Sequence, residues 1–456
     1  NSTSVTEENL IGAFASATLG YKNFLYFNAQ ARNDWTSTLE EANRSILYPS
    51  ASVSFVPTEA FAGLQESKFI NYLKVRVGYG TSAGYPNPYS TRSILNTSAR
   101  TFVTAGGTIL NTNSVDNFFG NPDLKPELHA EIEGGIEGRF FNNRLGVDLS
   151  LYNKTSSDLI INLTLDPSTG FTSTTVNAAE LTNKGIELGL DFTPIQTSNF
   201  SWTLNGNFTK NEPIVESIYP GIDQILLTGF TGFANAAVPG RPYGIFIGQG
   251  ILKDENGNKI LSAAGRYLSD PTDKELGNPN PNFNLNGGTT VSWKGLSFNM
   301  LWTYQDGGDI QAATPYTLMG RGILQETDFD RFVPVIAPGV NQEGQPNRVQ
   351  MTSTDHYWEN GGVFQWEHGL YDASYVKLRE ASLSYVLPKT LLNKTPFGNI
   401  VITFSGQNIW FRALGVPKGA NFDPEVMSLG VGNGRGMEFM NVPTARQYGG
   451  SIRLTF

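Results

Sequence analysis

The residues of this chain that are able to do chemistry are few and scattered. The sequence contains no cysteine and only three histidines, His129, His356 and His368, whose spacing does not match that of metal ligands. A zinc site would therefore need carboxylate ligands, and no such set is identified. No combination of nucleophile, base and oxyanion donor stands out either. The sequence predicts a protein that is not an enzyme and that uses no metal or cofactor.

One short segment has the alternating oxygen side chains of a calcium loop. It reads Asp254-Glu255-Asn256-Gly257-Asn258, but it lacks the glycine at the sixth position and the later glutamate of such loops. Asn-Gly is a strong signal for a tight hairpin turn. We therefore predict a turn here rather than a cation site.

Four aromatic residues are candidates for contact with a transported ligand, because they gather in one long predicted loop. Such rings stack on a sugar or on a peptide side chain. They can equally pack the loop on itself or face a partner protein, and the sequence leaves the three alternatives open. The candidates are Tyr357, Trp358, Trp366 and Tyr371.

Charged side chains inside the predicted strands all fall opposite the apolar residues of their strand. In a membrane barrel this face lines a wet lumen, whereas a charge at mid-depth in lipid costs about 2–4 kcal/mol. In a soluble sheet the same pattern describes a solvent face. The lumen-facing candidates are Lys74, Arg76, Glu133, Glu137, Arg139, Asp148, Glu187, Asp191 and Arg453.

The elements that must position these residues are β-strands. With 49 Gly, 24 Pro and 12% aromatic residues, the composition favours a β-protein with many turns. Alternation of apolar and polar residues predicts roughly thirteen strands. A change in the parity of the alternation between Leu378 and Leu383 predicts a β-bulge. The strands are expected at 12–21, 24–35, 48–57, 69–80, 132–140, 145–151, 184–193, 200–208, 285–293, 296–304, 374–387, 399–408 and 447–456.

The last of these strands favours a membrane location. Its apolar face carries Tyr448, Ile452, Leu454 and finally Phe456. A strand that closes a membrane barrel stays paired and ends at the interface, where an aromatic ring is favoured.

The connections between the strands alternate between short and long along the chain. Outer-membrane barrels have this pattern, with short periplasmic turns and long extracellular loops, and aromatic residues beside the short turns agree with it. No apolar run approaches the ~18 residues of a membrane helix. The formal charge of -9 argues against a nucleic-acid partner.

Strand parity gives an expectation about the rest of the protein. Bacterial barrels have an even number of strands with both ends in the periplasm. An odd count ending in the periplasm therefore places Asn1 in an extracellular loop. We expect residues 1–456 to be the C-terminal portion of a larger barrel, broken or cleaved in a surface loop, and the translated chain to begin earlier.

Several motifs resemble, in order, those of SusC/RagA-type TonB-dependent outer-membrane importers of Bacteroidota. The resemblance covers nearly all 456 residues, and the motifs are specific as an ordered set rather than singly. They lie at 48–54, 72–80, 121–127, 183–188, 240–246, 277–281, 374–379, 405–409, 422–426 and the terminal strand, and include Asn121-Pro122-Asp123-Leu124-Lys125-Pro126-Glu127 and Phe422-Asp423-Pro424-Glu425-Val426.

The resemblance implies an all-β, antiparallel transmembrane β-barrel of about 22 strands with a plugged lumen. This chain would supply about thirteen C-terminal strands, since the plug domain and the N-terminal strands are absent from it. The implied role is import of oligosaccharides or peptides across the outer membrane of a Gram-negative bacterium. The implied partners are a SusD-like lipoprotein on the extracellular face, the missing N-terminal barrel and plug portion from the same gene or a separate chain, TonB acting through that plug, and outer-membrane lipid.

Two alternatives belong to other functional classes. One is a SusC-like barrel that serves as a structural scaffold in an outer-membrane assembly. The other is a soluble, secreted β-rich glycan-binding protein or glycosidase, which as an enzyme would need two carboxylates about 5–9.5 Å apart. A soluble protein would bury its apolar rows across a dry sandwich interior, so the location of these rows decides between the classes.

Overall fold

The chain is all-β, with a few short helices in its connections. The computed structural model describes residues 5–97, 102–110, 113–361, 365–420, 422–430, 432–442 and 444–456. Two compact units are present: residues 1–138, 150–185 and 212–223 form the first, and residues 139–149, 186–211 and 224–456 form the second. In the described residues, no helix combines the length and apolarity needed to span a membrane.

All thirteen predicted strands are present, and most extend further than predicted. They are β1 Leu10–Tyr21, β2 Leu25–Thr36, β3 Ser45–Phe55, β4 Ile70–Gly84, β10 Glu127–Phe140, β11 Leu145–Thr164, β12 Ser173–Gln196, β13 Phe200–Ser217, β19 Phe283–Trp293, β20 Leu296–Asp306, β25 Leu370–Val386, β26 Asn399–Gly415 and β28 Gln447–Thr455. Strands β10 to β13 each run from one unit into the other.

Tight turns join several of these strands at one end. Lys22 and Asn23 between β1 and β2 both have positive φ, 46° and 61°, as the two central residues of a type I′ turn require. Lys294 and Gly295 do the same between β19 and β20, with φ of 46° and 87°. Two other connections at this end carry short helices: α1 Pro57–Ala60 and α2 Ala62–Gln65 after β3, and α5 Lys389–Leu392 after β25.

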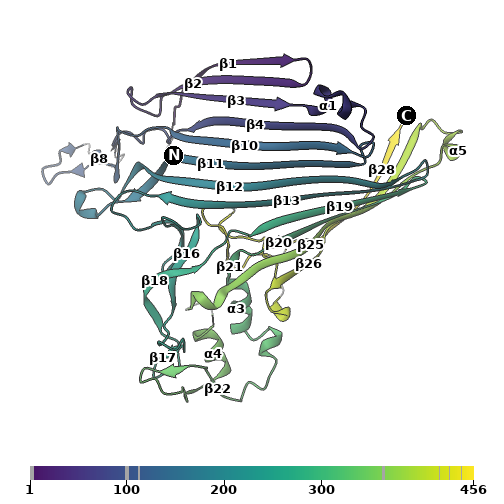
Figure 1. The fold of residues 1–456 in the computed structure, drawn as a ribbon. Coiled ribbons are helices and arrows are strands. Elements are labelled where there is room, and N and C mark those ends of the chain that lie inside the picture. Colours follow the sequence, from purple (N-terminus) through teal and green to yellow (C-terminus); the bar gives the residue numbers. More distant parts are fainter. Residues whose placement is uncertain are drawn as a thin grey trace. The chain divides into compact units, whose positions relative to one another are not determined.

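The first unit sorts its side chains into two faces. Strands β1 to β4 lie side by side in antiparallel order (Figure 1), and their register aligns like residues across the sheet. One apolar row is Leu19, Phe27, Val53 and Val77. The adjacent polar row is Thr18, Asn28, Ser52 and Gly78.

The apolar row is exposed rather than covered by protein. Leu19 is 66% exposed, Val53 43% and Val77 54%. A sandwich would bury such residues against a second sheet. The exposed row therefore does not form the dry interior that a sandwich would need.

The second unit continues the antiparallel pattern. Its strand order is β13-β19-β20-β25-β26-β28. The register of β25 shifts between Leu378 and Glu380 against β26, and opposite Leu301 and Trp302 of β20. The predicted β-bulge is thus confirmed, and the extra residue is Arg379.

Long connections contain structure that strand periodicity does not predict. The connection after β13 folds into a four-stranded sheet, β14-β15-β16-β18, whose Phe233 and Phe246 are buried with Met437. The strands are β14 Ile225–Phe230, β15 Phe233–Ala237, β16 Ile245–Ile251 and β18 Ser269–Gly277. The connection after β20 contains β21 Asp309–Ala312, α3 Ala313–Gly320 and α4 Ser353–Glu359. Short strands complete the connections: β5 Leu95–Thr97, β6 Phe102–Val103, β7 Ile109–Leu110, β8 Asn113–Val115, β9 Phe118–Phe119, β17 Ile260–Leu261, β22 Val335–Ile336, β23 Val340–Asn341, β24 Gln350–Met351 and β27 Met437–Glu438.

Two connections predicted to be long are short. Only residues 37–44 separate β2 from β3, and only residues 165–172 separate β11 from β12. The reason is that the strands continue through Ser-, Thr- and Asn-rich segments, whose polar residues pair in a ladder as well as apolar ones do. The length alternation therefore holds for the connections after β4, β13, β20 and β26.

Candidate functional site

The polar face of the first unit carries ion pairs between neighbouring strands. Arg76 on β4 donates to the Glu133 carboxylate over 3.3 Å and to the Ser150 hydroxyl over 2.5 Å. Lys74 lies 3.6 Å from Glu137. Four of the predicted lumen-facing residues are thus brought together on one face, although their contact with a lumen stays a prediction.

A cavity of about 420 Å³ opens on this same face. Its lining combines hydroxyl, amide and charged groups, including Asn28, Ser52, His129, Glu131 and Lys154. Hydrogen bonds from Thr18 to Asn28 (2.8 Å) and from Asn28 to Ser52 (3.4 Å) hold the wall in place. Such a surface offers hydrogen bonds to the hydroxyl or peptide groups of a ligand.

The remaining charged candidates lie in the second unit. A Cβ added at Gly146 would lie 2.6 Å from Nη1 of Arg139 and 3.5 Å from Cβ of Asp191, so these two residues flank the same glycine. Arg453 lies opposite Val401 in the β26–β28 ladder. Asp148 and Glu187 lie on β11 and β12. Their role as lumen residues also stays a prediction.

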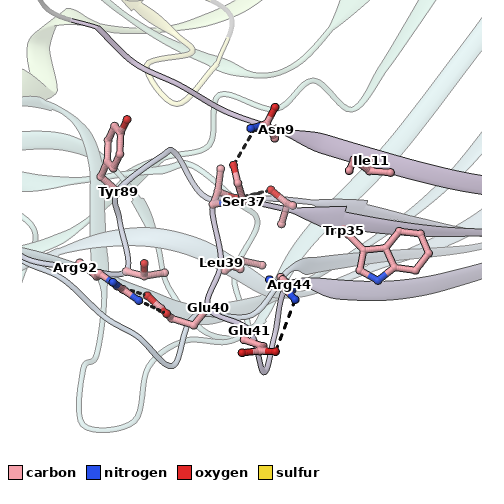
Figure 2. Close-up of a pocket in the computed structure, with 13 residues that line it drawn as sticks. Asn9, Ile11, Trp35, Ser37, Leu39, Glu40, Glu41, Arg44, Tyr89 and Arg92 are labelled. Carbon is pink, nitrogen blue, oxygen red and sulfur yellow. Dashed lines mark hydrogen bonds and ion pairs between the residues drawn. The ribbon is translucent and has the colours of Figure 1, made fainter.

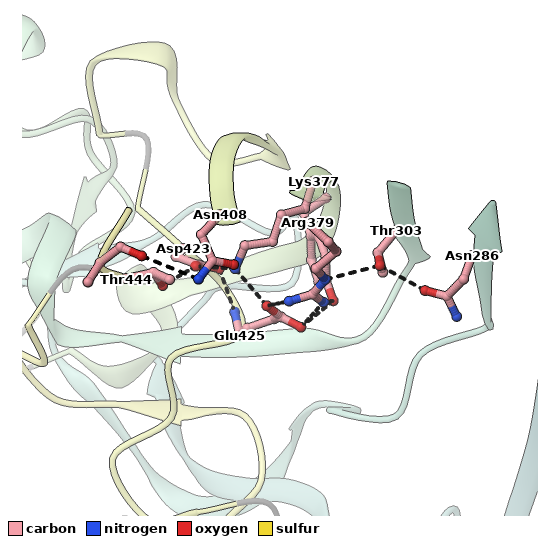
Figure 3. A network of polar contacts seen from close by, with 10 residues as sticks. Asn286, Thr303, Lys377, Arg379, Asn408, Asp423, Glu425 and Thr444 are labelled. Carbon is pink, nitrogen blue, oxygen red and sulfur yellow. Dashed lines mark hydrogen bonds and ion pairs between the residues drawn. The ribbon is translucent and has the colours of Figure 1, made fainter. Parts of the chain in front are cut away.

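A buried charge network joins β25 to the connection 416–446 (Figure 3). Lys377 is 2% exposed, and its ammonium lies 2.7 Å from Asp423 and 2.7 Å from Glu425. Arg379 donates to both oxygens of Glu425, and Thr444 donates to Asp423. The network contains two cations and two carboxylates and fixes the connection to the polar face of the strand; we call it the loop clamp (Lys377, Arg379, Asp423, Glu425).

The loop clamp changes the acidity of its glutamate. Burial alone raises the pKa of Glu425, but hydrogen bonds from Arg379 and Lys377 outweigh burial and lower this pKa to about 2. Glu425 therefore stays ionised over the whole physiological range, and the clamp remains closed there.

A hydrogen-bonded chain extends from the loop clamp across neighbouring strands. Arg379 donates through Nε to the Thr303 hydroxyl over 3.0 Å, and Thr303 donates to Asn286 over 2.8 Å. Asn286 then donates to Asn207 over 2.9 Å. The bulge matters here, because it gives β25 the extra residue, Arg379, that makes both contacts.

Sequence reasoning did not find the loop clamp as a site, although both halves lie in motifs singled out above. The available signal was a pair of cations two residues apart on one strand face, Lys377 and Arg379, and a pair of acids two residues apart, Asp423 and Glu425. Nothing in the sequence indicates that the two pairs meet.

The four candidate aromatic residues lie in different surroundings. Trp366 stacks on Phe230, with ring centroids 5.7 Å apart, and on Phe233 at 5.4 Å. Tyr371 packs against Phe422. On α4, Tyr357 lies beside Phe329, whereas Trp358 is 37% exposed with Arg321 over its ring. Trp366 and Tyr371 thus pack against other connections, and only Tyr357 packs against its own loop. Contact of any of the four with a ligand stays a prediction.

A second large cavity, of about 770 Å³, lies in the first unit between β2 and the connections near it (Figure 2). Arg92 clamps both oxygens of Glu40 at 2.7 and 2.8 Å, and Trp35 and Tyr89 line the same space. The hydrogen bonds from Arg92 lower the pKa of Glu40 to about 2. The cavity combines aromatic rings with satisfied polar groups.

The calcium-like segment and two of the three histidines have structural partners. Asp254 accepts hydrogen bonds from the backbone of Asn256 and Asn258, and Gly257 has φ of 81°, so the predicted turn is confirmed. His129 pairs with Ser156 at 2.8 Å, and His368 with Lys259 at 2.8 Å. Within the residues that the structure describes, no group of three potential ligands is placed to hold a metal ion.

Comparison with known proteins agrees with this architecture. The family model described as "TonB dependent receptor-like, beta-barrel" matches residues 1–318. TonB-dependent receptor P3 of Formosa agariphila is 25% identical over 99% of this chain and 46% of its own length. TonB-dependent receptor SusC of Bacteroides thetaiotaomicron is 25% identical over 48% of this chain and 22% of its own length.

Among solved structures, the RagAB peptide transporter shares the fold. The match has a TM-score of 0.74 at 21% identity and covers 98% of this chain and 48% of that chain. This chain therefore spans about half the length of the relatives it matches along its whole extent.

Proposed function

Because the chain belongs to the TonB-dependent receptor β-barrel family, we propose that it forms part of the wall and the long loops of an outer-membrane importer for oligosaccharides or peptides. The family comprises outer-membrane transporters rather than enzymes. The observation that carries the proposal is the sorting of the strands into an exposed apolar face and a polar face with ion pairs and a cavity. Lipid on one side and a solute path on the other account for both faces.

The substrate class and the partners rest on similarity. One relative is named SusC, and the structural neighbour is titled a peptide transporter. Oligosaccharides and peptides both present hydroxyl, amide and carbonyl groups, which the polar face is equipped to bind. We further propose that a SusD-like lipoprotein covers the long-loop side, and that TonB acts through a plug outside this chain.

A closed barrel also requires strands that this chain does not contain. Strand β1 pairs with β2 alone and β28 with β26 alone among the described residues, so each leaves one backbone edge unpaired. Unpaired edges are not tolerated in lipid. We propose that further strands of the complete receptor pair with both edges.

The test is uptake by the bacterium that carries the gene. Cells with the gene, without it, and with the gene restored should be compared for uptake of labelled oligosaccharides and of labelled peptides, with and without an uncoupler. We expect loss of uptake of one class on deletion, recovery on restoration, and dependence on the proton gradient. Uptake of both classes that does not change on deletion would contradict an importer. If, in addition, the protein is purified as part of an outer-membrane assembly, the scaffold role is favoured.

A further inference from the structure

A smaller cavity, of about 230 Å³, lies in the second unit beside the loop clamp. Its apolar walls include Leu318 of α3, Phe411 of β26 and Phe422 of the connection that follows. Val442 also lines it and is 83% exposed, which places this residue at the mouth. A space of this size accommodates a single amino-acid side chain.

Two carboxylates also line this cavity, and they differ in their partners. Asp423 is neutralised by Lys377 in the loop clamp. Glu438 is only 3% exposed, yet its donors are the backbone and hydroxyl of Thr314, at 2.9 and 2.6 Å, and the backbone of Asn441 at 2.9 Å. Among the side chains that the structure describes, which do not include Lys418, no basic group lies within ion-pair distance of Glu438.

A buried carboxylate without a cation is an unusual arrangement. Burying a charge is costly unless it is paired and hydrogen-bonded. An ionised carboxylate accepts about four hydrogen bonds, and Glu438 has three, two on Oε1 and one on Oε2. One acceptor position on Oε2 is therefore available for a donor that also carries positive charge.

We propose that this cavity binds an ammonium or guanidinium group on a short apolar stem, and that its ligand is the basic side chain of a peptide. The stem contacts Leu318, Phe411 and Phe422, and the charged end donates to Glu438. Lysine and arginine side chains have this combination of apolar stem and charged head. The inference rests on the proposed function for the source of the ligand, because the cavity is built from connections on the long-loop side.

The experiment is a binding measurement on the purified full-length receptor in detergent. The probes are the blocked tripeptide acetyl-Gly-Lys-Gly-amide and the same peptide with norleucine, which keeps the stem and lacks the charge. We expect the lysine peptide to bind about tenfold more tightly or better, since its ammonium makes a charge-assisted hydrogen bond to Glu438 that the methyl end of norleucine cannot make. Calorimetry or equilibrium dialysis reads out both affinities.

Three variants make the test specific. Glu438→Gln should reduce binding of the lysine peptide to that of the norleucine peptide. Val442→Trp, a change at an exposed position, should close the mouth and weaken binding of both peptides. Glu66→Gln, at an exposed position of the first unit that lines none of the three cavities described above, is the control and should change nothing.

Equal affinity for the two peptides, binding that both cavity variants leave unchanged, or no binding up to about 10 mM would overturn the proposal. Should Glu438→Gln fail to fold, the ratio of the two affinities and the effect of Val442→Trp decide together. Because the assay needs neither TonB nor a lid protein, its failure leaves the importer proposal standing. If a variant loses uptake but still binds the lysine peptide, the proposed cavity stands and the loss has another cause.

Discussion

The ammonium of Lys377 lies 2.7 Å from the Asp423 carboxylate, and both side chains are 2% exposed. Lys377 belongs to β25, whereas Asp423 belongs to the connection between β26 and β28. This ion pair therefore fixes a long loop to the polar face of a strand at a dry position, where solvent screens the attraction little. Glu425 and Arg379 extend it into the loop clamp.

Replacing Lys377 with methionine should release the connection 416–446. Removing one partner of a buried ion pair costs about 3–5 kcal/mol, because the other charge stays buried. We expect faster hydrogen exchange throughout 416–446, measured by mass spectrometry on the purified receptor. The matched control is Arg44→Met, whose exposed pair with Glu41 at 3.7 Å should be worth less than about 1 kcal/mol. Equal effects of the two changes would contradict a clamp.

The loop clamp should also open in acid. A carboxyl whose pKa is lowered by folding stabilises the folded form above its unfolded pKa and loses that contribution as the pH falls through its folded pKa. For Glu425 this window runs from 4.5 down to about 2. Hydrogen exchange of 416–446, corrected for intrinsic rates, should stay constant above about pH 5 and rise below it. Glu425→Gln should remove this pH dependence, and a variant that keeps it would show that another group titrates.

Sequence predicted the strands well because each strand has two different environments. In the row Leu19, Phe27, Val53 and Val77, every residue lies on the same exposed face, so the alternation is readable. Even the bulge at Arg379 was visible, since it breaks the alternation. The strand ends were predicted less well, because beyond the apolar band both faces are polar and the period disappears.

The loops were not predictable in the same way. Phe233 and Phe246 are buried on all sides, so the four-stranded sheet that contains them has no alternating pattern. The loop clamp joins residues 46 positions apart, and the contact of Glu438 with Thr314 spans 124 positions. Pairings over such distances depend on the tertiary fold and leave no local signal.

Alanine substitutions of the two candidate tryptophans, Trp366 and Trp358, should differ in their effects on stability. Trp366 stacks on Phe230 and Phe233, so Trp366→Ala should destabilise the four-stranded sheet β14-β15-β16-β18 by about 3–5 kcal/mol. Trp358 is 37% exposed, and Trp358→Ala should lower stability by less than about 1 kcal/mol. Thermal unfolding and substrate uptake should be measured on both. Reduced uptake with normal stability in Trp358→Ala would support ligand contact, whereas normal uptake would assign this ring to another role.

Neighbouring residues of one strand provide the most direct test of the membrane face. Val53 and Ser52 are adjacent on β3, but Val53 belongs to the exposed apolar row and Ser52 to the polar row. A lysine on a lipid-facing row costs up to about 2–4 kcal/mol at mid-depth and less toward the interfaces, while one on the polar face costs little. We therefore expect Val53→Lys to lower the unfolding free energy in lipid vesicles, or the yield of folded barrel, and Ser52→Lys to behave like the unchanged protein. Tolerance of both lysines would mean that the apolar row does not face lipid, and the importer proposal would lose its main support.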